Sequence, residues 1–514
     1  METMLGNLAI GLNAVLALQP ASIFGFTLSL PMNLLYCMLG AVIGTLIGVL
    51  PGLGPVATIA MLLPATFTLP PLGGLIMLAG IYYGAQYGGS TTAILVNLPG
   101  ETSSVVTCID GYQMARRGRA GVALTTAALS SFFAGCVGTL LLAAFAPPLA
   151  ELAFRFGPAE YFSLIVLGLF GAVVLSSGSL LKSIAMICLG LLGGIVGTDI
   201  NSDVARFTFG LPELSDGIGF VVVAMGVFGF AEVIGNLEKN EEREVFTKNV
   251  SGMFPGKEDF KRMVAPALRG TTLGSILGIL PGGGAVLAAF GAYALEKKVS
   301  KHRTEFGQGA IEGVAAPESA NNAAAQTSFI PLLTLGIPPN TVMALMVGAM
   351  TIHNIQPGPL VMATNPTLFW GLIVSMWFGN LMLVILNLPL IGIWVKLLTI
   401  PYRLLYPSIL VFCCIGVYTI NNSSFDVLLT AGFGLLGYIF SKLGCEGAPL
   451  LLGFVLGPML EEYFRRALLL THGDASVFFT RPISLSLLIL TAVMIVIVAL
   501  PAIKSKREEA FHEE

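Results

Sequence analysis

The longest uncharged run in the sequence constrains the fold more than any other feature. Between Thr3 and Gly100 there is no Asp, Glu, Lys, Arg or His, whereas one membrane-spanning helix needs about 20 apolar residues. The run must therefore supply several helices. Other uncharged windows that approach or exceed spanning length lie at 120–150, 161–181, 183–198, 270–295, 404–425 and 482–503. Together the windows predict about ten or more membrane segments.

The composition agrees with an integral membrane protein. Hydrophobic residues make up 55% of the chain and charged residues only 11%, against about 25% charged residues in soluble domains. The windows are continuously apolar and rich in Gly and Ala, which favours packed helices over the strict alternation of a membrane barrel. We therefore predict an all-α polytopic membrane protein in a lipid bilayer. No basic cluster is interleaved with aromatic residues, so nucleic acid is not an expected partner.

Three stretches of the first half recur, in the same order, in the second half. "GVLPGLGPVA" (48–57) matches "GILPGGGAVL" (278–287) at an offset of 230, and "CLGLLGGI" (188–195) matches "GFGLLGYI" (432–439) at 244. Between them, "LVNLPGETS" (95–103) matches "LTLGIPPNT" (333–341), with Pro99 against Pro338 and Thr102 against Thr341 at an offset of 239. This pattern indicates an internal duplication. We divide the chain into an N-terminal interfacial segment (1–30), membrane repeat 1 (31–236), a charged cytoplasmic linker (237–264), membrane repeat 2 (265–466), and a C-terminal transmembrane helix with a cytoplasmic tail (467–514).

The basic residues predict that the two repeats have inverted topology. "ARRGRA" (115–120) is basic and its counterpart "HNIQPGPLVMATNP" (353–366) is not, whereas "EKKVSKHR" (296–303) is basic and its counterpart "TFTLPPLGG" (66–74) is not. Because Lys and Arg concentrate in cytoplasmic loops, equivalent loops lie on opposite sides of the membrane. Inverted repeats around a site at mid-membrane depth are typical of secondary transporters.

Each repeat interrupts a helix with Pro and Gly near the middle of the predicted bilayer, at "LPGLGP" (50–55) and at "LPGGG" (280–284). Lipid cannot satisfy the backbone groups that such a break frees, so the break must face protein or a hydrated cavity. The half-helix after each break then directs its positive end and free N–H groups into that cavity. We predict anion-accepting helix ends, with the segments 265–280 and 284–299 forming a re-entrant hairpin. The alternative is a kink that serves close helix packing.

A second pair of polar segments is predicted to break the helices nearby. These are "YYGAQYGGSTTAILVN" (82–97) and "GVAAPESANNAAAQTS" (313–328), and an offset of 230 pairs Thr91 and Thr92 with Asn321 and Asn322. Hydroxyls and amides can donate to a carboxylate, and their oxygens can coordinate a small cation. Hydrogen bonding between helices is the simpler interpretation.

Glu318 is an ionisable group within otherwise uncharged sequence. A charge at membrane depth is costly unless it is paired or hydrated. Glu318 is therefore expected to take up a coupling proton, to help hold Na⁺, or to cap the helix that follows. A third break, "NLPGET" (97–102) against "GIPPNT" (336–341), predicts another helix start in each repeat, with Glu101, Thr102, Asn340 and Thr341 near its N-terminus.

These segments define the candidate site. The predicted substrate-binding residues are Pro51, Gly52, Gly54, Ser90, Thr91, Thr92, Asn97, Gly282, Gly283, Gly284, Ser319, Asn321, Asn322, Asn340 and Thr341. The predicted coupling-ion residues are Glu318, Gly52, Asn97, Gly283 and Asn322. The coupling ion would be Na⁺ or H⁺, and no cofactor or catalytic residue is predicted.

At these residues the chain resembles the large permease subunit of the tripartite tricarboxylate transporters. The similar stretches include "GVLPGLGP", "YYGAQYGGSTTAILVNLPGE", "DGYQMARRGRAG", "FGQGAIEGVAAPESANNA" and "PLLTLGIPPNT", and the resemblance covers about residues 31–503. It implies a permease of the bacterial inner membrane that works with a small membrane subunit and a periplasmic solute-binding protein. It also implies import of citrate or another carboxylate, driven by a Na⁺ or proton gradient. Pro339 and Asn340 stand where this family is expected to have Gly-Ser, and Pro339 offers no amide.

The leading hypothesis is therefore a secondary carboxylate permease whose broken segments move against a scaffold, an elevator-like motion expected only by analogy. The scarcity of Lys and Arg within the membrane leaves dicarboxylates open as substrates. The alternatives are an anion channel or a permease for another small organic anion. A membrane enzyme is the third class, but the sequence contains no H-E-x-x-H or G-x-S-x-G motif, so we predict that the chain is not an enzyme.

Overall fold

The structure is a computed structural model. It describes residues 2–23, 26–50, 54–175, 179–199, 202–238, 252–280, 284–397 and 402–499. Four residues of the predicted site, Pro51, Gly52, Gly282 and Gly283, lie outside the described residues, as does the tail from residue 500 onward.

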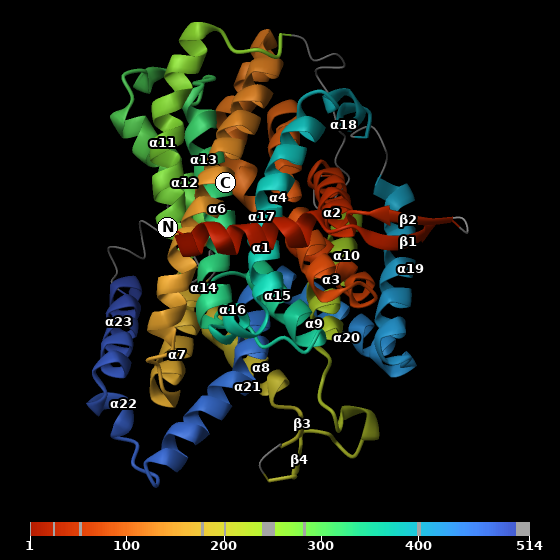
Figure 1. Ribbon diagram of the computed structural model, residues 1–514, viewed down its shortest axis with the longest axis vertical. Coiled ribbons are helices and arrows are strands. Elements are labelled where there is room, and N and C mark those ends of the chain that lie inside the picture. The colour runs from red at the N-terminus through yellow and green to blue at the C-terminus, as the bar shows by residue number, and fades with distance from the viewer. Residues whose placement is uncertain are drawn as a thin grey trace.

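Helices make up most of the described chain (Figure 1). The α-helices of the first half are α1 (Glu2–Leu16), α2 (Met32–Gly48), α3 (Pro55–Phe67), α4 (Pro71–Val96), α5 (Val105–Thr107), α6 (Ala120–Ala153), α7 (Pro158–Leu175), α8 (Leu180–Gly194), α9 (Phe220–Ala224) and α10 (Ala231–Glu238). Those of the second half are α11 (Lys257–Ile279), α12 (Gly284–Val299), α13 (Glu312–Thr327), α14 (Phe329–Leu335), α15 (Thr341–Ile352), α16 (Leu360–Thr364), α17 (Pro366–Asn387), α18 (Ile391–Leu397), α19 (Tyr402–Asn421), α20 (Ser424–Lys442), α21 (Gly447–Leu470), α22 (Val477–Thr480) and α23 (Pro482–Ala499).

Short irregular helices and two small hairpins complete the described part of the chain. The 3₁₀ helices are η1 (Thr102–Ser104), η4 (Pro212–Leu214) and η6 (Arg303–Glu305), and the π-helices are η2 (Cys108–Tyr112), η3 (Ala115–Arg119) and η5 (Met225–Phe230). The antiparallel hairpins pair β1 (Gln19–Ile23) with β2 (Phe26–Leu30), and β3 (Gly197–Thr198) with β4 (Ala205–Arg206). The hairpins were not predicted, but the all-α class is confirmed.

Three helical segments of the described chain are long and apolar enough to cross a membrane by length and composition: Ala115–Ala153, Pro366–Asn387 and Ser424–Lys442. Eight further apolar helices are shorter, among them α2, α3 and the described part of α23. This is fewer full-length spans than the uncharged windows predicted. The windows at 31–67 and 270–295 are each divided by a Pro-Gly segment, so each gives two helices where a continuous window would give one longer helix.

Helices α2 and α4 pack backbone to backbone through a row of glycines. A Cβ atom built on Gly40, Gly44 or Gly48 would collide with the carbonyl oxygen of Met77, Ile81 or Ala85 respectively. Helices α11 and α13 pack in the same way, because Gly270, Gly274 and Gly278 face the carbonyl oxygens of Ala316, Ala320 and Ala324. Glycine four residues apart allows this close approach in helix packing within membranes. The same contact therefore occurs once in each half of the chain.

The two rows of contacts correct the predicted pairing of the polar segments. The glycines of the two rows differ by 230 in residue number, but the carbonyl groups they face differ by 239. The reason is a longer connection: residues 68–70 join α3 to α4, whereas residues 300–311 join α12 to α13. Asn321 and Asn322 therefore take the places of Tyr82 and Tyr83, and their predicted pairing with Thr91 and Thr92 is wrong.

The polar segments do not break their helices, which corrects a second prediction. Residues 82–96 belong to the continuous helix α4, and residues 313–327 belong to α13, with Pro317 inside it. The glycines and alanines that suggested a break instead allow close contact with a neighbouring helix. Gly88 faces the carbonyl oxygen of Thr45, for example, where any side chain would collide.

Contacts elsewhere are reciprocal between the halves. Helix α6 packs on α13, and correspondingly α17 packs on α4. Helix α8 packs on α21, and correspondingly α20 packs on η5 and α10. Helix α3 packs on α15, and correspondingly α12 packs on η1. In chain order, α6 corresponds to α17, α4 to α13, and α8 to α20. Each of these contacts thus has a counterpart in which the equivalent elements belong to the opposite halves.

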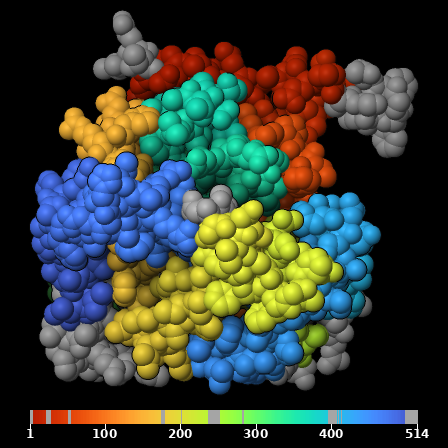
Figure 2. Space-filling model, turned by 90° about the horizontal axis from the view of Figure 1, so that it is seen from below, coloured from red at the N-terminus to blue at the C-terminus, as the bar shows by residue number. Residues whose placement is uncertain are grey.

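The ends of the chain pack on this core. Helix α1 lies along α17, with Gly11 against the backbone of Trp370, and α23 lies on α7, where the hydroxyls of Ser163 and Ser484 are 2.8 Å apart. The connection that contains β3 and β4 covers the lower end of the molecule beside α21 (Figure 2). Arg206 on β4 forms a 2.8 Å ion pair with Glu461 on α21.

The first helix of the second half starts within the predicted linker 237–264. Helix α11 begins at Lys257, eight residues inside the predicted boundary. Glu258 and Asp259 in its first turn favour a helix start there, since acidic side chains stabilise helix N-termini. The Asp259 carboxylate also accepts a hydrogen bond from the Gly256 amide (3.3 Å) and forms an ion pair with Arg119 (2.6 Å).

Candidate functional site

The carboxylate of Glu318 lies at the centre of a buried polar cluster. Glu318 is 1% exposed and lies within α13, so the prediction that it caps a helix is wrong. Its oxygens accept hydrogen bonds from the hydroxyls of Ser90 (2.8 Å), Thr107 (2.5 Å) and Ser131 (3.2 Å). These donors come from α4, α5 and α6. The cluster therefore joins elements of the first half to one helix of the second.

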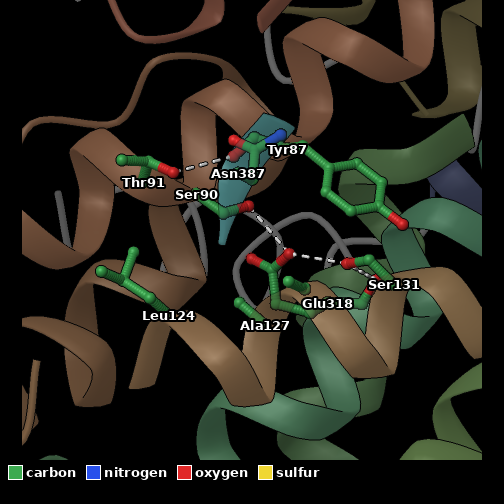
Figure 3. A pocket seen from close by; sticks show the side chains of 9 residues that line it. Tyr87, Ser90, Thr91, Leu124, Ala127, Ser131, Glu318 and Asn387 are labelled. Atoms are coloured by element: carbon green, nitrogen blue, oxygen red, sulfur yellow. Dashed lines mark hydrogen bonds between the residues drawn. The ribbon is translucent and has the colours of Figure 1, made fainter. Parts of the chain in front are cut away.

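A small cavity opens beside Glu318, with room for about one water molecule. It is lined by Tyr87, Ser90, Thr91, Leu124, Ala127, Ala128, Ser131, Glu318 and Asn387. Figure 3 shows the Ser90 and Ser131 hydroxyls flanking the Glu318 carboxylate. The lining consists of one carboxylate, hydroxyl and amide groups, and apolar side chains. It contains no basic side chain among these residues, so it is suited to positive rather than negative charge.

A second buried carboxylate, that of Glu101, lies in a neighbouring polar group. It accepts a hydrogen bond from the Ser103 hydroxyl and one from the Asn321 amide nitrogen (3.3 Å). Asn322 on the same helix donates to the Ser131 hydroxyl (2.7 Å) and to the Glu318 carbonyl oxygen (3.1 Å). The predicted pair Asn321 and Asn322 therefore connects the two carboxylates.

The third pair of breaks starts helices as predicted. Glu101 is the N-cap of η1 (φ −148°, ψ 164°) and Asn340 is the N-cap of α15 (φ −149°, ψ 173°). Just before them, Asn97 and Gly336 end α4 and α14 in the left-handed conformation, with φ of 59° and 73°. All of these equivalents lie 239 residues apart. The matching backbone angles indicate the same turn in both halves.

Asn340 presents a hydrogen-bond donor at the start of two helices. Its side-chain oxygen accepts from the Met343 amide (2.9 Å), which fixes the orientation of its amide group. Its Nδ2 atom is buried and forms no hydrogen bond of 3.5 Å or less among the described residues, although the side chain of Tyr82 lies close enough to interact with Asn340. A Cβ atom on Gly284, the first residue of α12, would lie 3.7 Å from this nitrogen. The free donor and the N-terminus of α12 therefore lie together, an arrangement that suits an anion.

The equivalent helix start in the first half already has an acidic partner. Gly54, the N-cap of α3, donates its backbone amide to the Glu232 carboxylate of α10 (3.3 Å). This contact agrees with the prediction that these helix ends accept anions. The starts of α3 and α12 therefore differ. The start of α3 already has an acidic side chain of the same chain, Glu232, as its partner.

The hydrogen bonds of the remaining predicted residues go elsewhere, although Thr91 lines the cavity beside Glu318. Thr92 donates to the Val49 carbonyl oxygen (3.0 Å) at the end of α2, and Thr91 donates within its own helix. Ser319 donates to the Ser130 carbonyl oxygen (3.3 Å), whereas Asn97 is exposed. Thr341 is the first residue of α15.

Sequence analysis missed Thr107, Ser131 and Asn387. Ser131 and Asn387 occur singly or in pairs within apolar windows, and only the packing of α6 and α17 brings them to Glu318. An amide at the end of the apolar run "LMLVILN" (381–387) is the one sequence signal that could have drawn attention to Asn387.

These features define a polytopic helical membrane protein with a buried polar centre. Residues 34–452 match the Tripartite tricarboxylate transporter TctA family, and the chain belongs to this family of transporters. It is 62% identical over 491 residues to an Agrobacterium vitis protein named "Uncharacterized 52.8 kDa protein in TAR-I ttuC' 3'region", covering 95% of this chain and 98% of the relative. A second Agrobacterium vitis protein, "Uncharacterized protein in TAR-II ttuC' 3'region", is 63% identical over 241 residues, covering 47% of this chain and all of the relative. No solved structure matches the chain.

Proposed function

We propose that the chain is the large permease subunit of a secondary transporter that imports citrate or a related carboxylate across the bacterial inner membrane. A Na⁺ or proton gradient drives the import. A periplasmic solute-binding protein delivers the substrate, and a small membrane subunit completes the system. Membership of the TctA family supports this assembly. The observation that carries the substrate class is the free Asn340 Nδ2 donor beside the start of α12.

The transport mechanism rests on two repeats of inverted topology. The reciprocal contacts between the halves support a two-fold relation, since such a relation exchanges equivalent elements across its axis. The matching N-caps at Glu101 and Asn340 support the same relation. The alternating basic loops support an axis in the plane of the membrane. In this arrangement the C-terminal tail is cytoplasmic and α23 is an additional transmembrane helix.

The substrate carboxylate binds at the second-half helix starts. The donors are the Asn340 amide and the first turns of α12 and α15. Helix N-termini bind carboxylates without a fixed cationic side chain, which suits a dicarboxylate as well as citrate. Pro339 removes one backbone donor from this turn, so the side chain of Asn340 takes a larger share of the binding.

Uptake into vesicles tests this function. Vesicles that contain all three proteins receive labelled citrate, succinate or a neutral sugar, under a Na⁺ gradient or a pH gradient imposed separately. We expect accumulation of a carboxylate above its external concentration, and no accumulation of the sugar. Accumulation that stops at equal concentrations would identify a channel. No carboxylate uptake under either gradient would contradict the proposed function.

The variant Asn340→Asp tests the substrate site. Aspartate keeps the cap on α15, as the carboxylate of Glu101 does in the equivalent position, but it replaces the donor by a negative charge. We expect KM for the carboxylate to rise by about tenfold or more, since a lost hydrogen bond to a charged group costs about 1.5–3 kcal/mol. Unchanged Tm shows that the cap is retained. An unchanged KM would remove Asn340 from the site.

A further inference from the structure

The cavity beside Glu318 has a different chemistry from the Asn340 site. Glu318 is 1% exposed, and its hydrogen bonds come from neutral hydroxyls rather than from a basic side chain. A substrate carboxylate at this cavity would meet a negative charge at close range. The lining of the cavity is therefore unsuited to the transported anion.

Two buried oxygens at the cavity have no hydrogen-bond partner within the described part of the chain. They are Asn387 Oδ1 and the Tyr87 hydroxyl, on residues that are 4% and 3% exposed. Asn387 Nδ2 donates to the Leu383 carbonyl oxygen (2.9 Å) of its own helix. The unpaired atom of the Asn387 amide group is therefore its oxygen. Buried polar atoms are normally satisfied. Both residues line this cavity, but Figure 3 shows the Tyr87 hydroxyl directed away from Asn387, so the unpaired Asn387 oxygen is the atom that points to a ligand in the cavity.

The hydroxyl of Ser90 can exchange one acceptor for another. Its oxygen lies 2.8 Å from Glu318 Oε2 and 3.0 Å from the Gln86 carbonyl oxygen. When the proton is donated to Gln86, the lone pairs of Ser90 and the Glu318 oxygen both become available to a cation. A cation at this point would find carboxylate, hydroxyl and amide oxygens, the donor atoms that hard cations prefer.

We propose that this cavity binds one Na⁺ ion, with Glu318, Ser90 and Asn387 as ligands. Ser131 orients the carboxylate, and Asn322 in turn holds the Ser131 hydroxyl. The single carboxylate balances a single positive charge, and the cavity has room for about one water molecule, which a Na⁺ ion does not exceed. The inference rests on the proposed function in one respect: the bound Na⁺ is the coupling ion. Both halves contribute ligands, so movement between them would open or close the site.

A binding experiment on the full-length protein in detergent tests the site without any transport. The Tm is measured at constant ionic strength while NaCl replaces KCl or choline chloride. A ligand that binds only the folded protein raises Tm in a saturable way. We expect this rise with Na⁺ and not with K⁺.

The variant Asn387→Ala removes one ligand, and Asn380→Ala is its matched control. Asn380 lies on the same helix, is buried, and also donates to the carbonyl oxygen four residues earlier (2.8 Å), but it does not line the cavity. Asn387→Ala should raise the Na⁺ concentration at half-effect by about tenfold or more, as loss of a ligand oxygen predicts. Asn380→Ala should leave it unchanged. Each midpoint is read from the variant's own baseline, so a general loss of stability does not imitate the result, and Ser90→Ala provides a second test.

Three results would overturn the proposal. The first is a wild-type Tm that does not respond to Na⁺. The second is a Tm that rises on acidification to the same extent in KCl as in NaCl, which would assign a proton to Glu318. The third is the same Na⁺ concentration at half-effect in Asn387→Ala and in the wild type. Proton-driven carboxylate uptake with no Na⁺ binding would overturn the Na⁺ site and leave the proposed function standing. Na⁺ binding without carboxylate uptake under any gradient would do the reverse.

Discussion

Asp110 joins two segments of the chain that are about 200 residues apart. One oxygen of this fully buried carboxylate accepts the backbone amides of Gly309 (2.7 Å) and Ala310 (2.9 Å), and the other accepts the Tyr293 hydroxyl (2.9 Å). Asp110 lies on the π-helix η2, a helix type that often occurs at functional positions. The residue thus connects the first half to the start of α13 and to α12.

The variant Asp110→Asn should destabilise the protein. Its amide nitrogen would face either the two backbone donors, which would lose their acceptor, or the tyrosine hydroxyl, which would have to accept instead of donate. Loss of these hydrogen bonds to a carboxylate costs about 1–3 kcal/mol. The measurement is Tm in detergent. Asp203→Asn is the control, since Asp203 is exposed and its positive φ of 57° is equally accessible to asparagine. Equal Tm values for the two variants would contradict this role of Asp110.

At the scale of elements, local patterns predicted helix starts better than helix interruptions. The starts after Glu101 and Asn340 were predicted because a cap depends on the residues beside it. The interruptions predicted within α4 and α13 were wrong, because Gly and Pro have no fixed meaning until the neighbouring helix is known. Glu318 was identified as a lone acidic group. Its partners Thr107, Ser131 and Asn387 depend on the packing of other helices, which one sequence does not show.

The glycine contact between α11 and α13 makes a testable prediction about helix packing. In Gly274→Ala the new methyl group would lie 2.6 Å from the Ala320 Cα atom. We expect a loss of about 1–3 kcal/mol, typical of overpacking. In the control Gly432→Ala, on α20, nothing lies within 4 Å of the new atom, so the higher helix propensity of alanine should stabilise the protein by up to about 1 kcal/mol. Tm values in the opposite order would contradict the packing.

At the scale of the whole molecule, the proposed inverted topology of the repeats predicts on which side of the membrane each connection lies. Phe209, in the connection between β4 and α9, is 86% exposed, and Phe254, before α11, is 92% exposed. The proposed topology puts the first outside the inner membrane and the second in the cytoplasm. The proposed topology also puts in the cytoplasm the ion pairs of Arg262 with Glu305 (2.6 Å) and Glu312 (2.7 Å). The hydrogen bond from Arg262 lowers the pKa of Glu305, so the Glu305 carboxylate remains charged at neutral pH.

Cysteine labelling tests this topology. Phe209→Cys and Phe254→Cys are introduced separately into a chain in which the exposed Cys188 is replaced by Ser. A maleimide that cannot cross the inner membrane should label only the Cys at 209 in cells with a permeable outer membrane, and both positions after lysis. Labelling of position 254 in intact cells would reject the topology. The parent chain without either new cysteine gives the background.

The glycine rows also limit how the helices can move. The carbonyl groups of α4 pack against glycines of α2, and those of α13 pack against glycines of α11. The glycines recur every four residues, so neighbouring contact points are about 6 Å apart along the helix. If one helix of a pair slid along the other by less than this spacing, backbone atoms of the two helices would collide. Each helix pair therefore moves as a rigid body or shifts by one full spacing. Gradual movement during a transport cycle would take place at the interfaces between the pairs, which side chains fill.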